Sequence, residues 1–259
     1  MKTSPDGAPP SRNERQPHAA LDRSSRQVKA AKIVEIIGAQ KFRQARRILE
    51  VGSGSGVIVH HLAGIAGPGC EVHGVDVHDS RIESSGYTFT QVTGTTLPFD
   101  DGYFDVVVSN HVIEHVGGRT AQVHHLREIG RVLAPEGVAY LAAPNKWRLV
   151  EPHFHLPLLS WLPQKLADRY VRATGKGSHY DCDPPSHGRA LQMCSEAGFT
   201  VAGRTLQAVR ETLRIELPPL LSRLSMPFAN DWLSRPLMPL MPTYVFLLQA
   251  QPTSPHRGP

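Results

Sequence analysis

The chain has 259 residues, of which 40% are apolar and 20% are charged. This length is enough for one large domain or two small ones, and the composition excludes a chain that stays mostly unfolded. The formal net charge is +5, but about +3 of it lies in the first 30 residues. The rest of the chain is too weakly basic for a phosphate-binding surface, so we expect no nucleic-acid partner.

The three cysteines, Cys70, Cys182 and Cys194, lie far apart and form no C-x-x-C pair. This spacing predicts neither a disulfide framework nor a zinc ribbon, and a reducing cytoplasm is the expected location. The sequence also contains no apolar leader and no run of 18 apolar residues. We therefore expect a soluble protein without a transmembrane span. Peripheral contact with a membrane is compatible with this composition.

Residues 1–27 are rich in Pro, Ser and Arg without a hydrophobic period, which predicts a disordered tail. From residue 28 to about 251 we expect one domain that opens with an amphipathic helix near Gln27. Strands and helices then alternate as strand 47–51, helix 57–66, strand 70–76, edge strand 87–92, strand 104–109, helix 120–133 and strand 137–143. This alternation is typical of a parallel sheet covered on both faces and predicts a doubly wound α/β fold.

After Pro144 the alternation stops, which predicts an insertion over about 146–185 after the fifth strand. Beyond it we expect helix 186–197, strand 200–206, an irregular segment over about 217–242, strand 244–250 and a frayed end over 252–259. The insertion lies at the edge where open α/β sheets bind ligands, so it is interpreted as a lid over the site. The alternative is that its apolar side chains, among them Phe154 and Trp161, pack an added helix onto the core.

The segment Ile48-Leu-Glu-Val-Gly-Ser-Gly-Ser-Gly56 runs from a strand into a glycine-rich turn and a helix. Glycines at alternate positions let the backbone approach a ligand closely, and the helix start offers N–H groups to it. The spacing G-x-G-x-G differs from the G-x-G-x-x-G of dinucleotide-binding proteins. A nucleotide-like cofactor other than NAD is therefore indicated.

Asp76 closes the next strand, 24 residues after Gly52. An acidic side chain at that strand end can accept hydrogen bonds from both hydroxyls of a ribose. Its alternative role is to cap a turn. Together with the glycine loop, the ribose interpretation is the stronger one.

Four sequence blocks, in order, resemble the class I S-adenosylmethionine-dependent methyltransferases, in particular the small-molecule group related to the ubiquinone methyltransferases. The blocks are ILEVGSGSG (48–56), VHGVD (72–76), LPFDDGYFDVVVSNHVIEHV (97–116) and LREIGRVLAPEGVAYLAAPN (126–145). The resemblance implies a mostly parallel, seven-stranded, Rossmann-like sheet with S-adenosylmethionine as the cofactor.

The same resemblance implies a role for individual residues. Glu50 and the loop residues Gly52, Ser53, Gly54 and Gly56 would hold the methionine end, Asp76 the ribose and Val77 the adenine. Thr93 stands where the family usually has an aspartate, so that its hydroxyl and the Gly94 backbone would bind the adenine amine. Asn110 would offer its backbone to the methionine end, and His111 and His115 would lie near the sulfonium.

The fourteen histidines raise the question of a metal site. The pairs 60–61 and 124–125 are adjacent on predicted helices and do not share a face. His153 and His155 could ligate an ion only with a third ligand from His179, Asp181, Asp183 or His187. We expect surface and packing roles for most histidines and no metal site.

The sequence thus predicts methyl transfer from S-adenosylmethionine to a small-molecule or lipid-like, amphipathic acceptor by in-line displacement. If the acceptor is a hydroxyl, the candidate bases are the histidines at and near the insertion: His115, His153, His155 and His179. The alternatives are a catalytically silent cofactor-binding scaffold on the same fold and, less favoured, an NAD-dependent oxidoreductase. The acceptor, the methylated atom and the oligomeric state stay open.

Overall fold

A computed structural model of the chain describes residues 22–216 and 241–251. The expected tail up to residue 21, most of the irregular segment and the frayed end lie outside the described residues. The boundary of the tail at residue 27 is wrong, because helix α1 spans Arg23–Ile37. Asp22 caps this helix, and its carboxylate accepts hydrogen bonds from the N–H groups of Ser24 and Ser25.

The centre of the molecule is a seven-stranded sheet with the order β3-β2-β1-β4-β5-β9-β8. The strands are β1 (Arg47–Val51), β2 (Glu71–Asp76), β3 (Thr88–Gln91), β4 (Phe104–Asn110), β5 (Leu133–Pro144), β8 (Phe199–Gly203) and β9 (Thr243–Ala250). All neighbours pair in parallel except β9, which is antiparallel to both β5 and β8. The doubly wound, mostly parallel seven-stranded sheet is confirmed, with β3 at one edge.

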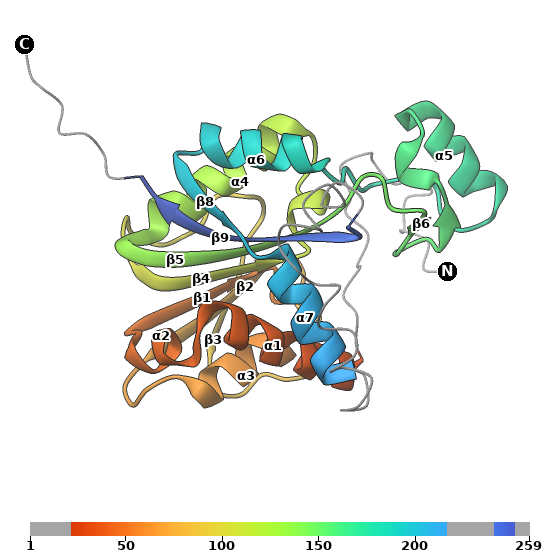
Figure 1. Cartoon of the computed structure of the whole chain (residues 1–259). Coiled ribbons are helices and arrows are strands. Elements are labelled where there is room, and N and C mark those ends of the chain that lie inside the picture. The colour runs from red at the N-terminus through yellow and green to blue at the C-terminus, as the bar shows by residue number, and fades with distance from the viewer. Residues whose placement is uncertain (1–21, 217–240, 252–259) are drawn as a thin grey trace, which may run out of the picture.

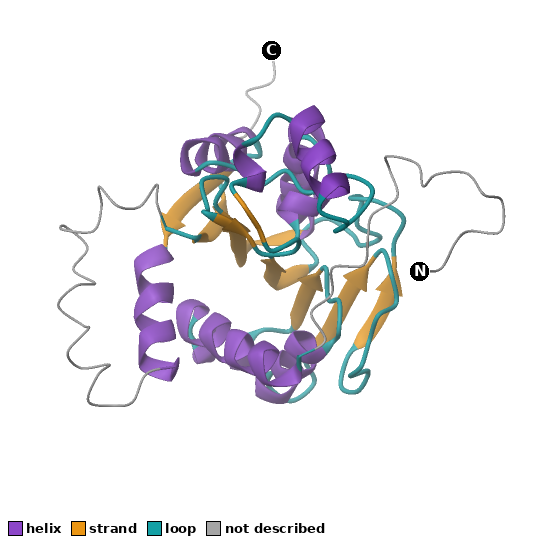
Figure 2. Cartoon of the chain, turned by 90° about the vertical axis from the view of Figure 1, so that its right-hand side faces the viewer, coloured by secondary structure: helices purple, strands orange, loops and turns teal. Residues whose placement is uncertain are grey.

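Helices cover both faces of the sheet (Figures 1 and 2). One face packs against α1, α2 (Ala39–Gln44), α3 (Val57–Ile65) and α7 (Thr205–Glu216). The other face packs against α4 (Arg119–Val132) and α6 (His187–Glu196). Ile48 and Leu49 point to opposite layers from the central strand β1, and both are fully buried. Strands buried on both faces explain the unbroken apolar runs in the sequence.

The structure differs from the expectation near residue 200. The predicted strand 200–206 ends at Gly203, and α7 begins at Thr205. Thr205 is buried, and its hydroxyl accepts a hydrogen bond of 3.0 Å from the N–H of Val245 on β9. This contact anchors the start of a helix that the sequence analysis did not predict.

The insertion after β5 forms a small unit beside the sheet (Figure 1). It contains β6 (Val150–Glu151), β7 (Leu156–Pro157), the 3₁₀ turn η2 (Leu159–Trp161) and α5 (Gln164–Ala173). It has its own apolar core, made by Phe154, Leu156, Leu159, Ala167, Val171, Tyr180 and Cys182. Within the described residues, no helix is long and apolar enough to cross a membrane.

Candidate functional site

A cavity of about 840 Å³ opens at the carboxyl ends of β1, β2, β4 and β5. Such a volume is near the upper end for small-molecule sites and suits a cofactor together with a small acceptor. Nine of the residues singled out from the sequence line it: Gly52, Gly54, Asp76, Val77, Gly94, Asn110, His111, His115 and His153. Glu50, Ser53 and Thr93 are next to lining residues in the chain without lining the cavity themselves, and Gly56 is two residues beyond the lining residue Gly54.

His155 and His179 lie outside the cavity lining; His155 is exposed and His179 is partly buried. Nδ1 of His179 is 2.9 Å from the hydroxyl of its neighbour Ser178. The structure therefore brings only His115 and His153, of the four candidate bases, to the cavity.

The glycine loop between β1 and α3 uses the left-handed backbone region. Gly52, Gly54 and Gly56 have φ values of +74°, +50° and +78°, which residues other than glycine rarely adopt. The N–H groups of Gly52 and Ser53 both donate to the carbonyl of Val75, at 2.8 and 3.0 Å. The loop is thus tied to the end of β2, where Asp76 follows.

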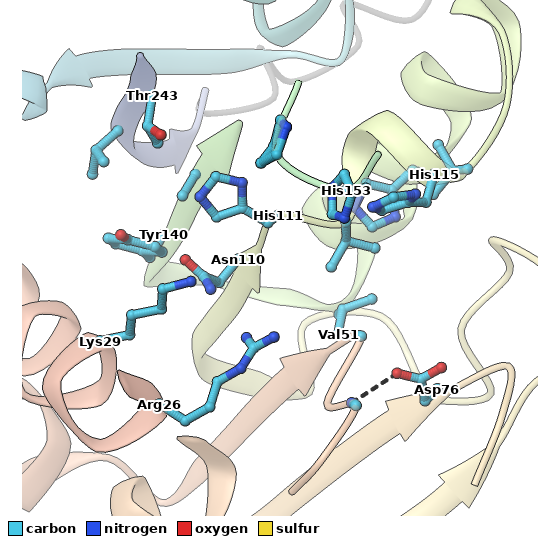
Figure 3. A pocket seen from close by; sticks show the side chains of 18 of the residues that line it. Arg26, Lys29, Val51, Asp76, Asn110, His111, His115, Tyr140, His153 and Thr243 are labelled. Atoms are coloured by element: carbon cyan, nitrogen blue, oxygen red, sulfur yellow. Dashed lines mark hydrogen bonds between the residues drawn. The ribbon is translucent and has the colours of Figure 1, made fainter. Parts of the chain in front are cut away.

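Asp76 is hydrogen-bonded to this loop at the cavity wall (Figure 3). Its Oδ2 accepts a hydrogen bond of 2.8 Å from the N–H of Gly54, and its Oδ1 accepts one of 3.1 Å from the N–H of His78. A carboxylate oxygen has more than one acceptor site. Asp76 can therefore hold the loop and still accept hydrogen bonds from a ligand.

Two buried polar side chains near the loop have atoms that lack a hydrogen-bond partner. They are Oε2 of Glu50, at the base of the loop, and Nδ2 of Asn110, at the end of β4; within the loop, the buried hydroxyl of Ser53 also lacks a partner among the described residues. Burial raises the pKa of Glu50 well above its usual value, against the attraction of Arg26. Unsatisfied buried groups are costly, so these atoms indicate a ligand with both a donor and an acceptor.

The end of β4 leads into a cluster of acidic and basic side chains. His111 adopts φ = +59°, a conformation that is uncommon for residues other than glycine and occurs at functional sites. The fully buried Glu114, on the 3₁₀ turn η1 (Ile113–His115), lies 3.4 Å from Nδ1 of His111 and 3.8 Å from Nε2 of His115. Burial acts to raise the pKa of Glu114, but the two histidines outweigh it and the pKa is lowered.

Four cations line the cavity on its α1 side. Arg26, Lys29 and Lys32 repeat every three residues along α1, and Arg148 comes from the start of the insertion. Burial, followed by repulsion from Arg26, Lys32 and Arg148, lowers the pKa of Lys29. Figure 3 shows Arg26 and Lys29 reaching towards Asn110 and His111. The sequence predictions did not include this group. Its helical spacing begins at Arg26, which was expected to lie in the tail.

Between α1 and α7 the cavity wall is apolar. It is formed by Ile36 on α1, Tyr140 and Ala142 on β5, Ala208 and Val209 on α7, and Val245 on β9. This part of the wall depends on α7, which the sequence analysis had not placed.

Comparison with known proteins finds a family match for the part of the chain that carries the glycine loop. The family model described as "Methyltransferase domain" matches residues 49–141, from β1 through β5. That range contains the glycine loop, Asp76 and the end of β4. This match supports the prediction of a class I, S-adenosylmethionine-dependent methyltransferase domain over this part of the chain.

Relatives of known name match parts of this chain. It is 31% identical over 106 residues to the ubiquinone/menaquinone biosynthesis C-methyltransferase UbiE of Ectopseudomonas mendocina (strain ymp), covering 37% of this chain and 40% of that one. It is 22% identical over 196 residues to a probable tRNA methyltransferase 9B of Homo sapiens, covering 74% and 42%. The chain spans about half, or less, of the length of the curated relatives it matches.

A solved methyltransferase structure resembles the fold of this chain. A crystal structure of a putative sarcosine dimethylglycine methyltransferase from Galdieria sulphuraria matches with a TM-score of 0.53 and 16% sequence identity. The match covers 88% of this chain and 86% of that one. At this identity the likeness concerns the fold, which agrees with the Rossmann-like methyltransferase architecture.

The residues present fit the family's cofactor, S-adenosylmethionine. Asp76 retains acceptor capacity for ribose hydroxyls, and the orphaned atoms of Glu50 and Asn110 complement the ammonium and carboxylate of the methionine end. Arg26 adds a positive charge near Glu50. At the adenine end, Gly94 rather than Thr93 lines the cavity, so its backbone is the better placed of the two expected contacts.

Proposed function

We propose that this chain transfers the methyl group of S-adenosylmethionine to a small-molecule or lipid-like acceptor that carries an acidic group. The supporting observation is the cation group of Lys29, Lys32 and Arg148 beside an apolar cavity wall. Like charges gathered at a half-buried site repel one another, and an anionic ligand offsets that repulsion. The apolar wall between α1 and α7 suits the uncharged part of the same acceptor.

The cofactor supplies an already activated methyl group, so the work of the protein is positioning. It must place the accepting atom about 3 to 3.5 Å from the methyl carbon and in line with the departing sulfur. The glycine loop, Glu50 and Asp76 would fix the cofactor from one side, and α1 with Arg148 would fix the acceptor from the other. For a hydroxyl acceptor, His115 and His153 are the proposed proton acceptors at the cavity.

The function is tested by an assay that does not require knowledge of the acceptor. Purified chain and S-adenosylmethionine with a radiolabelled methyl group are incubated with separate lipid, small-molecule and tRNA fractions of cell extract. We expect S-adenosylhomocysteine to form and the label to appear in a lipid or small-molecule product retained by an anion exchanger. Label in tRNA alone would contradict the proposed acceptor class, and cofactor binding without turnover in any fraction would indicate a silent scaffold. Calorimetric titration with NAD tests the remaining alternative, and we expect no binding.

The cation group is tested with a matched pair of variants. Lys29→Gln removes a charge that lines the cavity, whereas Lys41→Gln removes an exposed charge on α2. The substrate in this test is the acidic acceptor that gives the labelled product. We expect its KM to rise about tenfold or more in Lys29→Gln, because a charge-assisted contact is lost. Cofactor affinity should stay within about twofold in both variants. An unchanged KM in Lys29→Gln would remove the acidic group from the proposal.

A further inference from the structure

Three potential metal ligands from separate segments meet beside the cavity. They are His115 on η1, His153 in the loop between β6 and β7, and Cys182 in the segment that leads to α6. One ligand atom of each lies within 4.8 Å of the other two. Figure 3 shows the imidazoles of His115 and His153 side by side, with ring centroids 4.7 Å apart.

The spacing of these atoms suits a tetrahedral ion. Nδ1 of His115 is 3.6 Å from Sγ of Cys182. Zinc bonds of about 2.3 Å to sulfur and 2.0–2.1 Å to nitrogen, at the tetrahedral angle, place two such donors about 3.6 Å apart. The pair therefore already has the separation of two ligands on one zinc ion, and His153 completes the set with a small movement.

The surroundings orient His115 for this role. Oε1 of the fully buried Glu114 lies 3.8 Å from Nε2 of His115, on the side of the ring away from Cys182. Neither carboxylate oxygen of Glu114 has a hydrogen-bond partner of good geometry among the described residues. A carboxylate behind the outer nitrogen of a ligating histidine is the usual support of zinc sites, because it fixes the ring and its tautomer.

The other two ligands are held by their backbones. The buried carboxylate of Glu151 accepts hydrogen bonds of 2.8 and 2.7 Å from the N–H groups of His153 and Phe154. Next to Cys182, the N–H of Asp183 donates to the carbonyl of Glu114 at 2.8 Å. The fold of the insertion thus brings His153 and Cys182 to η1 and keeps them there.

We propose that His115, His153 and Cys182 form a site for Zn²⁺ whose fourth position faces the cavity. A thiolate with two imidazoles selects zinc over the hard cations Mg²⁺ and Ca²⁺. His115 and His153 line the cavity, whereas Cys182 is buried behind them, so the remaining position is directed to the acceptor side. Three protein ligands and one open position are the arrangement of catalytic zinc sites.

The role of the ion rests on the proposed function. It would bind the oxygen of a hydroxyl acceptor and lower the pKa of that hydroxyl, so that its proton passes to water in the cavity rather than to His115 or His153. The existence of the site is independent of methyl transfer and of the cofactor.

Cobalt spectroscopy tests the site directly. The full chain, freed of metal with a chelator, is titrated with Co²⁺, and Zn²⁺ is then added as a competitor. We expect one equivalent of Co²⁺ to give a near-ultraviolet charge-transfer band from a thiolate ligand, and Zn²⁺ to abolish it. A lack of the band, or of binding at one equivalent, would overturn the proposal.

Matched variants identify the ligands. Cys182→Ser should abolish the band, whereas Cys194→Ser should keep it, because Cys194 is also buried but lies on α6, in the core that α6 forms with the sheet. His153→Ala should weaken zinc binding by more than the roughly 10- to 100-fold expected for the supporting variant Glu114→Gln. His155→Ala, two residues along the same loop, should leave zinc affinity unchanged. A band that persists in Cys182→Ser would overturn the site.

Two further measurements distinguish a misfolded variant from one that has lost zinc binding, and zinc binding from methyl transfer. Near-ultraviolet circular dichroism of each metal-free variant shows whether it is folded, and His115→Ala tests the site again if Cys182→Ser is not. Zinc binding without S-adenosylhomocysteine formation would contradict the proposed function and leave the metal site standing. Methyl transfer that is normal in chelator-treated protein without zinc would contradict the role of the ion.

Discussion

Asp76 joins the glycine loop to the turn after β2 at the wall of the cavity. It accepts hydrogen bonds from the glycine loop and from His78, and it faces the cavity. Asp76→Ala should therefore raise the Kd for S-adenosylmethionine about 10- to 100-fold, equivalent to about 1.5–3 kcal/mol for charge-assisted contacts. Isothermal titration calorimetry measures this change, and Asp79→Ala is the control because that exposed carboxylate pairs only with Arg81 among the contacts seen. An unaltered Kd in folded Asp76→Ala would remove Asp76 from the site.

The carboxylate of Glu50 should lower the stability of the folded chain and raise its affinity for the cofactor. Burial raises its pKa, so the folded chain holds this proton more tightly than the unfolded chain, in which the pKa is about 4.3. The folded state then binds more protons, and the contribution of Glu50 to stability falls as pH rises above about 4.3. Glu50→Gln removes this effect.

At pH 8, we expect Glu50→Gln to melt at a higher temperature than the parent chain, with a free energy of unfolding about 0.5–2 kcal/mol larger. This gain in stability should shrink towards pH 5. Its cofactor affinity should fall, because a carboxylate that complements the ammonium is lost. Thermal unfolding over pH 5–8 measures the first effect and calorimetry the second. The exposed Glu71→Gln should show neither. A gain that grows towards acid pH would contradict the assigned pKa shift.

At the residue scale, the sequence predicted the part of the cavity wall at the ends of β1 and β2 better than the part near the insertion. Gly52, Gly54 and Asp76 follow strands directly, so the parallel sheet alone brings them together. His115 and Cys182 are 67 residues apart and meet only because the insertion folds back onto η1. No local pattern carries that contact, which is why the three potential metal ligands could not be found from spacing.

At the element scale, the turn from β1 into α3 depends on close packing as well as on backbone freedom. Gly56 and Gly69 have almost the same φ, +78° and +77°, but a side chain at Gly56 would collide with the carbonyl of Glu83 and the hydroxyl of Tyr87, whereas Gly69 faces open space. Both Ala variants carry the left-handed backbone cost of about 1–2 kcal/mol. Gly56→Ala should lose clearly more stability than Gly69→Ala in denaturant unfolding, and it should also weaken cofactor binding. Equal losses would show that the loop can move away from Glu83.

Two aromatic residues of the insertion, Phe154 and Trp161, differ in their burial. Phe154 is buried and contacts Tyr180 edge-on, whereas Trp161 is 41% exposed and packs on Trp147. Phe154→Ala should cost about 3–5 kcal/mol of stability, and Trp161→Ala a small fraction of that. Chemical denaturation measures both. Near-equal costs would mean that the insertion does not hold its own core.

Element types were predictable where one physical signal dominated. Apolar runs such as that of β4 gave the central strands, because these are buried on both faces. The start of α1 was missed because its first buried residue is Ala30, a full two turns after Arg23. Its first turn is held instead by the Asp22 cap and by a hydrogen bond of 2.9 Å from Arg23 to Glu83, which no hydrophobic period reveals.

At the scale of the whole molecule, α1 joins the fold and the site. Ala30 and Ile33 pack on the sheet, while Arg26 and Lys29 of the same helix line the cavity. The N-terminal boundary of the domain is therefore also a boundary of the site, and a boundary at residue 27 would have divided it.

Two truncated chains test this arrangement. A chain that begins at residue 22 keeps the cap, the bond from Arg23 to Glu83 and all the cations of α1. It should match the full chain in melting temperature and in Kd for S-adenosylmethionine. A chain that begins at residue 28 loses the cap, worth about 1 kcal/mol, and loses Arg26 beside Glu50. It should melt at a lower temperature and bind the cofactor more weakly, as differential scanning calorimetry and titration would measure. Arg26→Gln in the full chain separates the two causes, because it should weaken binding while the cap remains. Equal cofactor affinity in all three proteins would exclude Arg26 from the cofactor site and leave α1 a purely structural helix.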